Sequence, residues 1–136
     1  MAKSYWLVKQ EPSTYSFNQL VREKRACWDG VRNFQARNNL AKMRVGDRAL
    51  FYHSGDAREV VGIAEVAREA YPDPTAKEAR WVAVDLVAVR PLKKPVTLEQ
   101  IKSTPALRTI ALVRQSRLSV MPLVAAEFEA IVKLGS

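Results

Sequence analysis

The sequence is poor in residues that hold metals and cross-link chains. Among 136 residues there is one cysteine, Cys27, and one histidine, His53. A single cysteine excludes a disulfide within the chain, and the two residues cannot supply the four ligands of a structural zinc site. They could form a nucleophile and its base. However, Cys27 lies among large residues, where a buried and unreactive thiol is the commoner outcome. We therefore expect no metal and no other cofactor.

Long apolar runs are also missing. No stretch of about 18 apolar residues occurs, so the sequence predicts no membrane-spanning helix. The first residues lack an apolar segment followed by a small-residue cleavage site, which argues against a secretory signal and for a cytoplasmic location. Only 5 glycines are present, and 48% of the residues are hydrophobic. This composition predicts one globular domain over residues 1–136, which we expect to be a monomer.

Acidic side chains are the minority among the charges. The chain has 22 lysines and arginines against 14 aspartates and glutamates, a formal net charge of +8. A small basic domain suits a polyanion such as nucleic acid. The other reading is a solvated basic face that only keeps the protein dispersed. Residues 32–48 contain five basic residues and one acidic residue: Arg32, Arg37, Lys42, Arg44 and Arg48, with Asp47.

The first third of the chain predicts one strand and two helices. Aromatic and β-branched residues favour a strand over residues 4–9, which Pro12 ends. Ser16 and Gln19 have capping-box spacing, which predicts a helix over residues 16–24. Residues 28–30 indicate a turn. A second helix is expected to begin at residue 31 or 32. Its inward face would consist of Phe34, Ala36, Leu40 and Met43.

The rest of the chain is richer in strands. Alternating patterns predict strands over residues 48–54, 59–68 and 80–90, the last ended by Pro91 and Pro95. Two prolines predict a stiff loop over residues 71–75. A short helix over 97–103, a helical turn after Pro105, an extended piece over 118–122 and a helix over 125–133 follow. Trp6 and Trp81 are expected in the core. These elements favour an α+β domain whose sheet curls into a small barrel.

One stretch, WDGVRNFQARNNL at residues 28–40, is crowded with planar polar groups. Guanidinium and carboxamide side chains carry directional donors suited to flat, hydrogen-bonding molecules. The predicted helix would place Arg32 and Asn33 in its first turn, where backbone amides favour an anion such as phosphate. Alternatively, Asn33 caps the helix and the other amides face water.

Several blocks together resemble the EVE domain family. They are WLVKQEP at 6–12, WDGVRNFQARNNL at 28–40, VGD and LFYHS up to Ser54, VGIAEVAREAYPDPTA at 61–76 and LSVMP at 118–122. They occur in order over nearly the whole chain. The resemblance implies a PUA-like fold, a pseudo-barrel of mostly antiparallel strands with flanking short helices. It also implies binding of nucleic acid that carries a modified base.

The resemblance further implies a set of pocket residues. Carried onto this sequence, they are Trp28, Asn33, Lys9, His53, Ser54 and Ser119. Tyr71, in the proline-framed loop, would either stack on the ligand or pin the loop. Each residue also has a structural reading: His53 as a hydrogen-bonded strand-end histidine, Lys9 as a surface cation, and the serines as turn residues.

The sequence departs from the family pattern in two places. Gln10 stands where the family usually has serine or threonine, which puts any hydroxyl contact there in doubt. Only residues 77–80 join the YPDPTA block to the next strand, where many relatives carry a longer insertion. A shorter loop would leave one wall of the pocket open.

The resulting hypothesis is a non-enzymatic reader of a modified base in DNA or RNA. The base would leave its stack and lie against Trp28, with the Asn33 amide on its edge. Flanking phosphates would be held by Arg32, Arg37 and Asn38. One alternative is an enzyme that acts on nucleic acid or a nucleotide with Asp29 or Glu11 as general base. Another is a protein-interaction module with an exposed apolar patch.

Overall fold

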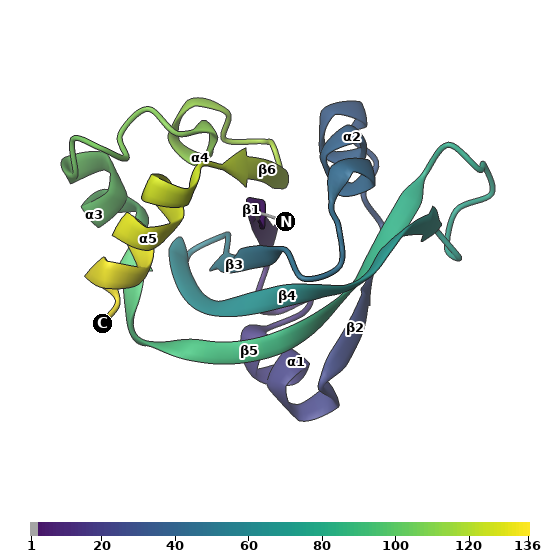
Figure 1. Cartoon of the computed structure of the whole chain (residues 1–136), viewed down its shortest axis with the longest axis horizontal. Helices are drawn as coiled ribbons and strands as arrows, with labels where there is room; N and C mark the ends of the chain where they lie inside the picture. Colours follow the sequence, from purple (N-terminus) through teal and green to yellow (C-terminus); the bar gives the residue numbers. More distant parts are fainter. Residues whose placement is uncertain (1–2) are drawn as a thin grey trace.

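A six-stranded mixed sheet organises the computed structural model, which describes residues 3–136 (Figure 1). Across the sheet the strand order is β2-β5-β4-β3-β1-β6. β1 and β3 are parallel, and the other neighbouring pairs are antiparallel. The sheet curls without closing, because β2 and β6 form separate edges. The strands are β1 (Tyr5–Gln10), β2 (Arg25–Trp28), β3 (Arg48–His53), β4 (Glu59–Pro72), β5 (Val82–Thr97) and β6 (Val120–Leu123).

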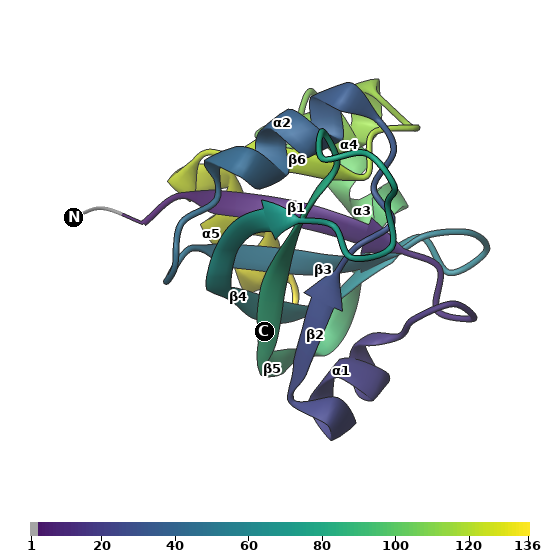
Figure 2. The same ribbon diagram turned by 90° about the vertical axis from the view of Figure 1, so that its right-hand side faces the viewer.

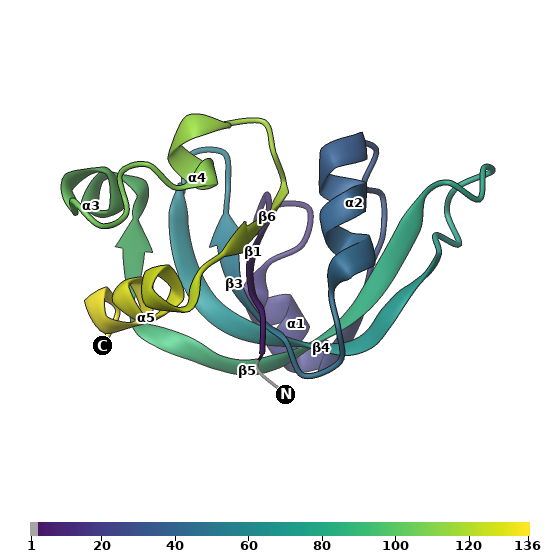
Figure 3. The same ribbon diagram turned by 45° about the horizontal axis from the view of Figure 1, so that its top comes forward.

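Five short helices flank this sheet. They are α1 (Phe17–Glu23), α2 (Phe34–Lys42), α3 (Leu98–Ser103), α4 (Ala111–Arg114) and α5 (Ala125–Leu134). α3, α4 and α5 lie on one side of β6 and β1, and α2 lies on the other (Figure 3). Asn39 of α2 donates a hydrogen bond to the Val120 carbonyl of β6 at 2.7 Å. The α+β, PUA-like arrangement expected from the sequence is confirmed in this open pseudo-barrel form. Within residues 3–136, each helix is too short or too polar to reach across a lipid bilayer.

Helix caps are the elements that the sequence predicted best. The Ser16 hydroxyl accepts a hydrogen bond from Gln19 N at 3.1 Å and starts α1. The Gln19 side chain instead donates to Glu23, so this box is half formed. Thr97 and Gln100 form a complete capping box at the start of α3. Each cap satisfies amides that have no partner inside the helix, which makes the signal local and readable.

The long hairpin of β4 and β5 differs from the prediction. β5 continues through Pro91 and Pro95 to Thr97. The hydrogen-bond ladder between β4 and β5 is interrupted there, which is why the strand tolerates the prolines. Gly62 pairs with Pro91 and Val60 pairs with Val96, so residues 92–95 form a bulge. β4 also extends to Pro72. Tyr71 is therefore a strand residue and does not lie in a proline-framed loop.

Helix α2 starts later than expected. Asn33 is its N-cap, with Oδ1 accepting from Ala36 N at 2.9 Å, so neither Arg32 nor Asn33 lies in the first turn. Phe34 is 52% exposed and does not face inward. Its ring centre lies 5.0 Å from that of Trp81, which precedes β5 and is half-buried. The expectation that Trp81 is a core strand residue is therefore wrong.

Trp6 is a core residue, as expected. Its indole N–H donates to Asp47 at 3.0 Å, and the same buried carboxylate accepts from Ser4 N and Arg44 N, each at 3.0 Å. Asp47 thereby ties the start of β1 to the turn between α2 and β3. Such a hub joins distant segments, which the local sequence pattern does not reveal.

Candidate functional site

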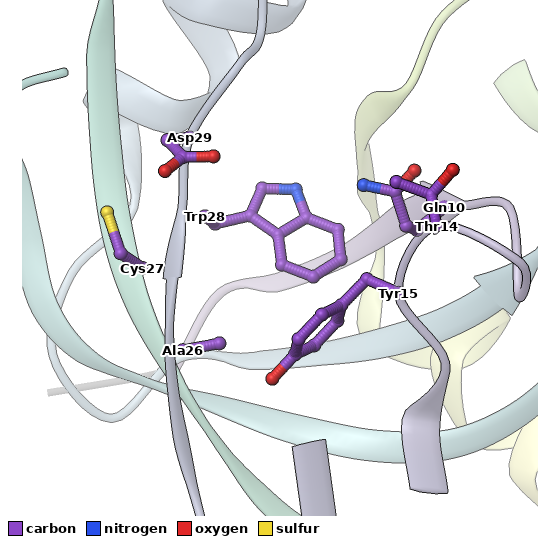
Figure 4. A pocket seen from close by; sticks show the side chains of 7 residues that line it. All are labelled: Gln10, Thr14, Tyr15, Ala26, Cys27, Trp28 and Asp29. Atoms are coloured by element: carbon purple, nitrogen blue, oxygen red, sulfur yellow. The ribbon is translucent and has the colours of Figure 1, made fainter. Parts of the chain in front are cut away.

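A cavity of about 240 Å³ lies between the end of β1, the segment that leads into α1, and β2. In Figure 2, β2 and α1 lie below the end of β1, and α2 runs above it. The cavity is lined by Gln10, Thr14, Tyr15, Ala26, Cys27, Trp28 and Asp29 (Figure 4). Its volume corresponds to about eight water molecules at ~30 Å³ each. A single pyrimidine base has a comparable number of non-hydrogen atoms.

Trp28 forms the aromatic wall of this cavity. It is the last residue of β2 and is only 5% exposed. Its indole meets the ring of Phe51 edge-on at 5.4 Å and the ring of Tyr15 edge-on at 6.4 Å. Rings at these distances and angles pack favourably. The indole is therefore held in place by core packing while one side of it borders the cavity (Figure 4).

The polar groups of the cavity are left open for a ligand. Gln10 Oε1 accepts from Glu11 N at 3.1 Å, and the Gln10 amide NH₂ has no partner within residues 3–136. In the part of the chain that the structure describes, the Trp28 indole N–H, the Thr14 hydroxyl and the Asp29 carboxylate form no hydrogen bond. Figure 4 shows the polar ends of Gln10 and Asp29 on either side of the indole. The cavity thus offers donors and acceptors together.

Asp73 fixes the loop that follows Trp28. Its carboxylate is almost fully buried and accepts hydrogen bonds from Gly30 N (2.8 Å), the Arg32 guanidinium (2.9 Å) and both Thr75 N (2.7 Å) and Thr75 Oγ1 (2.6 Å). Burial by itself would raise the pKa of Asp73, but these donors outweigh it and lower the pKa to about 2. The result is a charged clamp between the β4–β5 connection and the cavity wall.

A second cluster supports β2 from behind. The Tyr71 hydroxyl donates to the Asp85 carboxylate and lies 3.0 Å from Cys27 Sγ. Arg25 donates twice to the same carboxylate, at 3.1 and 2.8 Å. Burial alone would raise the pKa of Asp85, and the hydrogen bonds from Tyr71 and Arg25 reverse that effect and lower it. Tyr71 therefore braces the strand and does not line the cavity.

Cys27 is exposed and not buried, contrary to expectation. The strand β2, which sequence patterns did not predict, turns this side chain to the face opposite the Trp28 indole, where its sulfur meets Tyr71 (Figure 4). Partial burial raises the pKa of the Cys27 thiol. A raised pKa lowers the thiolate fraction at neutral pH, so the thiol is not an activated nucleophile.

The structure does not gather the other expected pocket residues around Trp28. Lys9 and Ser54 line a second cavity, and Asn33 borders an open groove that includes Arg114 and Arg117. His53 Nε2 accepts from Phe17 N at 3.1 Å, and burial lowers the pKa of His53. The Ser119 carbonyl accepts from the backbone N–H of Lys9 at 2.9 Å.

The expected phosphate contacts have partners within the protein. Arg32 is bound to Asp73. The Arg37 guanidinium donates to the Arg80 carbonyl at 3.0 Å and to Asn38 Oδ1 at 2.7 Å. Arg37 and Arg80 also lie 5.4 and 6.0 Å from the ring centre of the exposed Phe34. These contacts build a surface cluster of aromatic and guanidinium groups at the start of α2.

Sequence reasoning did not single out four of the lining residues as ligand contacts: Gln10, Thr14, Tyr15 and Ala26. The available signal was the position of Gln10 at the end of the WLVKQEP block, where the sequence departs from the usual pattern. Asp29 was considered only as a turn residue or a general base. Among residues 3–136, no group of three or more histidine, cysteine, aspartate or glutamate side chains is placed to hold a metal ion.

A curled mixed sheet with short flanking helices defines a small domain of the PUA-like fold, and a ring-sized cavity with an aromatic wall lies at one end of β1. The fold, without any implication for function, is also similar to that of ASCH from Zymomonas mobilis (TM-score 0.61, 13% identity, 97% of this chain and 96% of that one). The family model described as EVE domain matches residues 4–134. The chain belongs to the EVE domain family.

Three relatives place the chain within this family. The structure of Rpa0253 from Rhodopseudomonas palustris is 49% identical, with a TM-score of 0.93 over 97% of this chain and 92% of that one. Mouse thymocyte nuclear protein 1 is 36% identical over 165 residues, which cover 96% of this chain and 73% of the mouse protein. The structure of human THYN1 in complex with 5-methylcytosine-containing DNA is 33% identical, with a TM-score of 0.90 over 98% of both chains.

Proposed function

We propose that this protein binds nucleic acid carrying a modified base and holds that base in the cavity beside Trp28. The observation that carries the proposal is the cavity itself: it has the size of one base, an aromatic wall, and donors and acceptors that have no partner in the described part of the chain. The human relative in complex with 5-methylcytosine-containing DNA supports the choice of partner. The net charge of +8 suits a polyanion.

The free energy of stacking on Trp28 is comparable to the cost of extruding a base, which makes this mode of binding feasible. Extruding a base from its stack costs a few kcal/mol. Contact with an aromatic side chain returns about 1–3 kcal/mol per base. Trp28 therefore roughly offsets the extrusion, and the hydrogen bonds to the base decide which base is retained.

The polar groups favour a base with an exocyclic amine. The Asp29 carboxylate can accept from that amine, and the Gln10 amide can donate to a neighbouring ring nitrogen or carbonyl. Cytosine presents this donor–acceptor pattern on one edge. A 5-methyl group could contact the Ala26 side chain. Burying one methyl contributes about 0.8 kcal/mol, or roughly fourfold in affinity. Among modified bases, 5-methylcytosine is thus the first to test.

Flanking nucleotides would contact the basic surface around the cavity. Asn33, Arg114 and Arg117 border one open groove, and Arg37 and Arg80 flank the exposed Phe34. Guanidinium groups bind phosphates, and exposed aromatic rings stack on unpaired bases. Such contacts add affinity that falls with salt but carry little information about the base.

The test is binding of matched oligonucleotides with cytosine or 5-methylcytosine at one position, measured by fluorescence anisotropy. We expect about fourfold tighter binding to the methylated strand. Trp28→Ala should abolish the difference, whereas Trp81→Ala, outside the cavity, should keep it. Because Trp28 is also part of the core, Asp29→Asn provides a second variant with an exposed side chain, and Asp56→Asn is its control. Equal affinity of the wild type for both strands, across other common base modifications too, would refute the proposal.

The proposal is binding without catalysis. Among residues 3–136, Asp29 is the only carboxylate that lines the cavity, and the Cys27 thiol has a raised pKa. General acid–base chemistry usually needs a second positioned proton donor or acceptor. Mass spectrometry of modified oligonucleotides after incubation should show no change in mass. A product that Asp29→Asn abolishes would instead establish an enzyme.

A further inference from the structure

A second cavity, of about 170 Å³, lies near the C-terminal end of β1 but involves the other face of that strand. It is lined by Lys9, Tyr52, Ser54, Gly55, Arg58, Leu98, Leu112 and Ser116. Lys9 pairs with Tyr52 across β1 and β3, and the next pair is Gln10 with His53. Successive side chains of a strand point to opposite faces of its sheet. Lys9 and Gln10 therefore serve different cavities although they are consecutive.

Tyr52 presents its hydroxyl to this second cavity. The residue is only 2% exposed, and its hydroxyl forms no hydrogen bond within residues 3–136. The hydroxyl oxygen itself is not shut off from solvent, so it can meet a ligand in the cavity. The hydroxyls of Ser54 and Ser116 likewise form no hydrogen bond in the described chain. A phenol with a buried ring and a hydroxyl that reaches the cavity offers a fixed hydrogen-bonding group to a polar ligand.

The charge of the lining selects the sign of that ligand. Lys9 and Arg58 are both lining residues, and no acidic residue is among them. Neither cation forms a salt bridge in the part of the chain that the structure describes. Asp56 and Glu99 line a separate cavity that shares Arg58. Two cations and three hydroxyls around a small space suit an anion rich in hydrogen-bond acceptors.

The lining is held in place by the fold. Lys9 Nζ donates to the Ser116 carbonyl at 2.7 Å and lies 5.7 Å from the ring centre of Tyr52. Burial lowers the pKa of Lys9, which an anionic partner would counteract. Arg58 adopts a left-handed backbone (φ 45°), which is uncommon for residues other than glycine. Residues in such conformations concentrate at ligand sites.

We infer that the cavity of Lys9, Tyr52 and Arg58 binds a phosphate group of the same nucleic acid strand whose base lies beside Trp28. This inference rests on the proposed function. The two cavities are served by consecutive residues of β1, whose Cα atoms are ~3.8 Å apart. A strand that passes over the end of β1 can place a base on one side and a neighbouring phosphodiester on the other. The cavity is too small for a whole nucleotide.

The test combines a neutral backbone linkage with single variants. A methylphosphonate removes the charge of one phosphodiester, and it is placed in turn at each linkage around the 5-methylcytosine. At one linkage we expect it to weaken wild-type binding about tenfold, as the loss of a charge-assisted contact does. Lys9→Met should weaken binding of the unmodified backbone by a similar factor and should be insensitive to the methylphosphonate at that linkage. Tyr52→Phe, which removes only the hydroxyl, should reduce affinity less.

Matched controls separate this site from general charge effects. Lys133→Met removes an exposed lysine of α5 and should leave the sensitivity to the methylphosphonate unchanged. Lys9→Met should reduce the slope of log affinity against log salt for a single strand by about 0.7, the value for one phosphate contact. Its preference for 5-methylcytosine over cytosine should persist. Thermal melting of each variant checks that the fold is intact.

The outcomes distinguish this inference from the proposed function. If the wild type prefers the methylated base but Lys9→Met and Tyr52→Phe respond to every linkage as the wild type does, the phosphate site is refuted and the base cavity stands. If no base preference exists at all, the proposed function fails. The last experiment is a titration with inorganic phosphate, followed by NMR. Suppose that phosphate shifts the signals of residues 9, 52 and 58, while a methylphosphonate weakens binding equally at every linkage. The site would then bind a free anion, and its assignment to a phosphate of the strand would be overturned.

Discussion

The Asp73 carboxylate accepts a hydrogen bond from the backbone N–H of Gly30 at 2.8 Å, across 43 positions of the sequence. Because Gly30 is two residues after Trp28, this bond connects the β4–β5 loop to the aromatic wall of the base cavity. Gly30 has a left-handed backbone (φ 79°), a conformation that glycine adopts without strain. The clamp and the glycine together set the direction in which the chain leaves β2.

Asp73→Ala should destabilise the protein by about 2–3 kcal/mol. The substitution removes the acceptor of four donors, and donors left without a partner in a buried site cost about 1–3 kcal/mol. Urea denaturation measures the effect. Asp56→Ala, at an exposed loop aspartate, is the control and should stay within about 0.5 kcal/mol of the wild type. Equal midpoints for the two variants would contradict the clamp.

The same clamp predicts a pH dependence. The pKa of Asp73 falls from 3.8 to about 2 in the folded protein. Its contribution to the free energy of unfolding is therefore complete above the unfolded pKa and is lost as pH falls through the folded pKa. The difference corresponds to about 2 kcal/mol. Between about pH 5 and pH 2, the wild type should lose that much more stability than Asp73→Asn. Parallel stability curves for the two proteins would contradict the assignment.

Gln10→Glu should weaken binding to a 5-methylcytosine oligonucleotide about tenfold. The substitution keeps the side-chain oxygen that accepts from Glu11 N but replaces the amide donor of the cavity with an acceptor. The variant loses one hydrogen bond to the base, and its carboxylate also repels the acceptor atom of the base, which together weaken binding by roughly this factor. Fluorescence anisotropy at constant salt is the measurement. Gln19→Glu, an isosteric change on α1 outside the cavity, should bind like the wild type.

Cys27 provides a chemical test of which face of β2 meets the base. Alkylation with iodoacetamide should be slow at pH 7 and should accelerate as pH approaches the raised pKa of the thiol, because the thiolate is the reacting form. The thiol lies on the face of β2 away from the Trp28 indole, so the alkylated protein should still bind a 5-methylcytosine oligonucleotide. Bound oligonucleotide should leave the alkylation rate unchanged. Cys27→Ala is the control and should bind nucleic acid before and after treatment. Loss of binding by the fully alkylated wild type would show that the base contacts this face of β2.

Gly62→Ala should destabilise the protein by about 1–3 kcal/mol, the usual penalty of overpacking. A Cβ at Gly62 would lie 2.4–2.6 Å from three ring atoms of Phe17, the first residue of α1. Displacing Phe17 would also move Tyr15, which lines the base cavity, so affinity should fall with stability. Thermal melting and anisotropy on the same samples test both effects. A variant as stable as the wild type would show that α1 can shift freely.

Local signals explain which parts of the fold the sequence predicted. Ser16 and Thr97 were readable as caps because each bonds to a backbone amide three positions away. The strand β2 was missed because four residues, RACW, are too short to show alternation. Phe34 was assigned to the wrong face because helical spacing defines a stripe but not its direction. Pro91 and Pro95 were assigned as strand ends because a bulge depends on the partner strand.

The candidate site was predicted less completely than the fold. Trp28 was identifiable from its motif, and the family resemblance suggested the class of ligand that is proposed. Gln10, Tyr15 and Asp29 meet Trp28 only because the chain folds back between β1 and β2. Asn33 was expected on the base edge, but its side-chain oxygen caps α2. Sequence shows which side chains can bind a base, whereas their convergence is a property of the tertiary structure.

The register of β1 has a further consequence for how such a protein can change. Lys9 and Gln10 face opposite sides of one strand. A single residue inserted into or deleted from β1 ahead of them would exchange the two faces. The Lys9 ammonium group would then point to the cavity beside Trp28, and the neutral Gln10 amide would point to the cavity of Tyr52 and Arg58. A point substitution can therefore alter one cavity without the other, whereas a change in the length of this strand would alter the lining of both cavities at once.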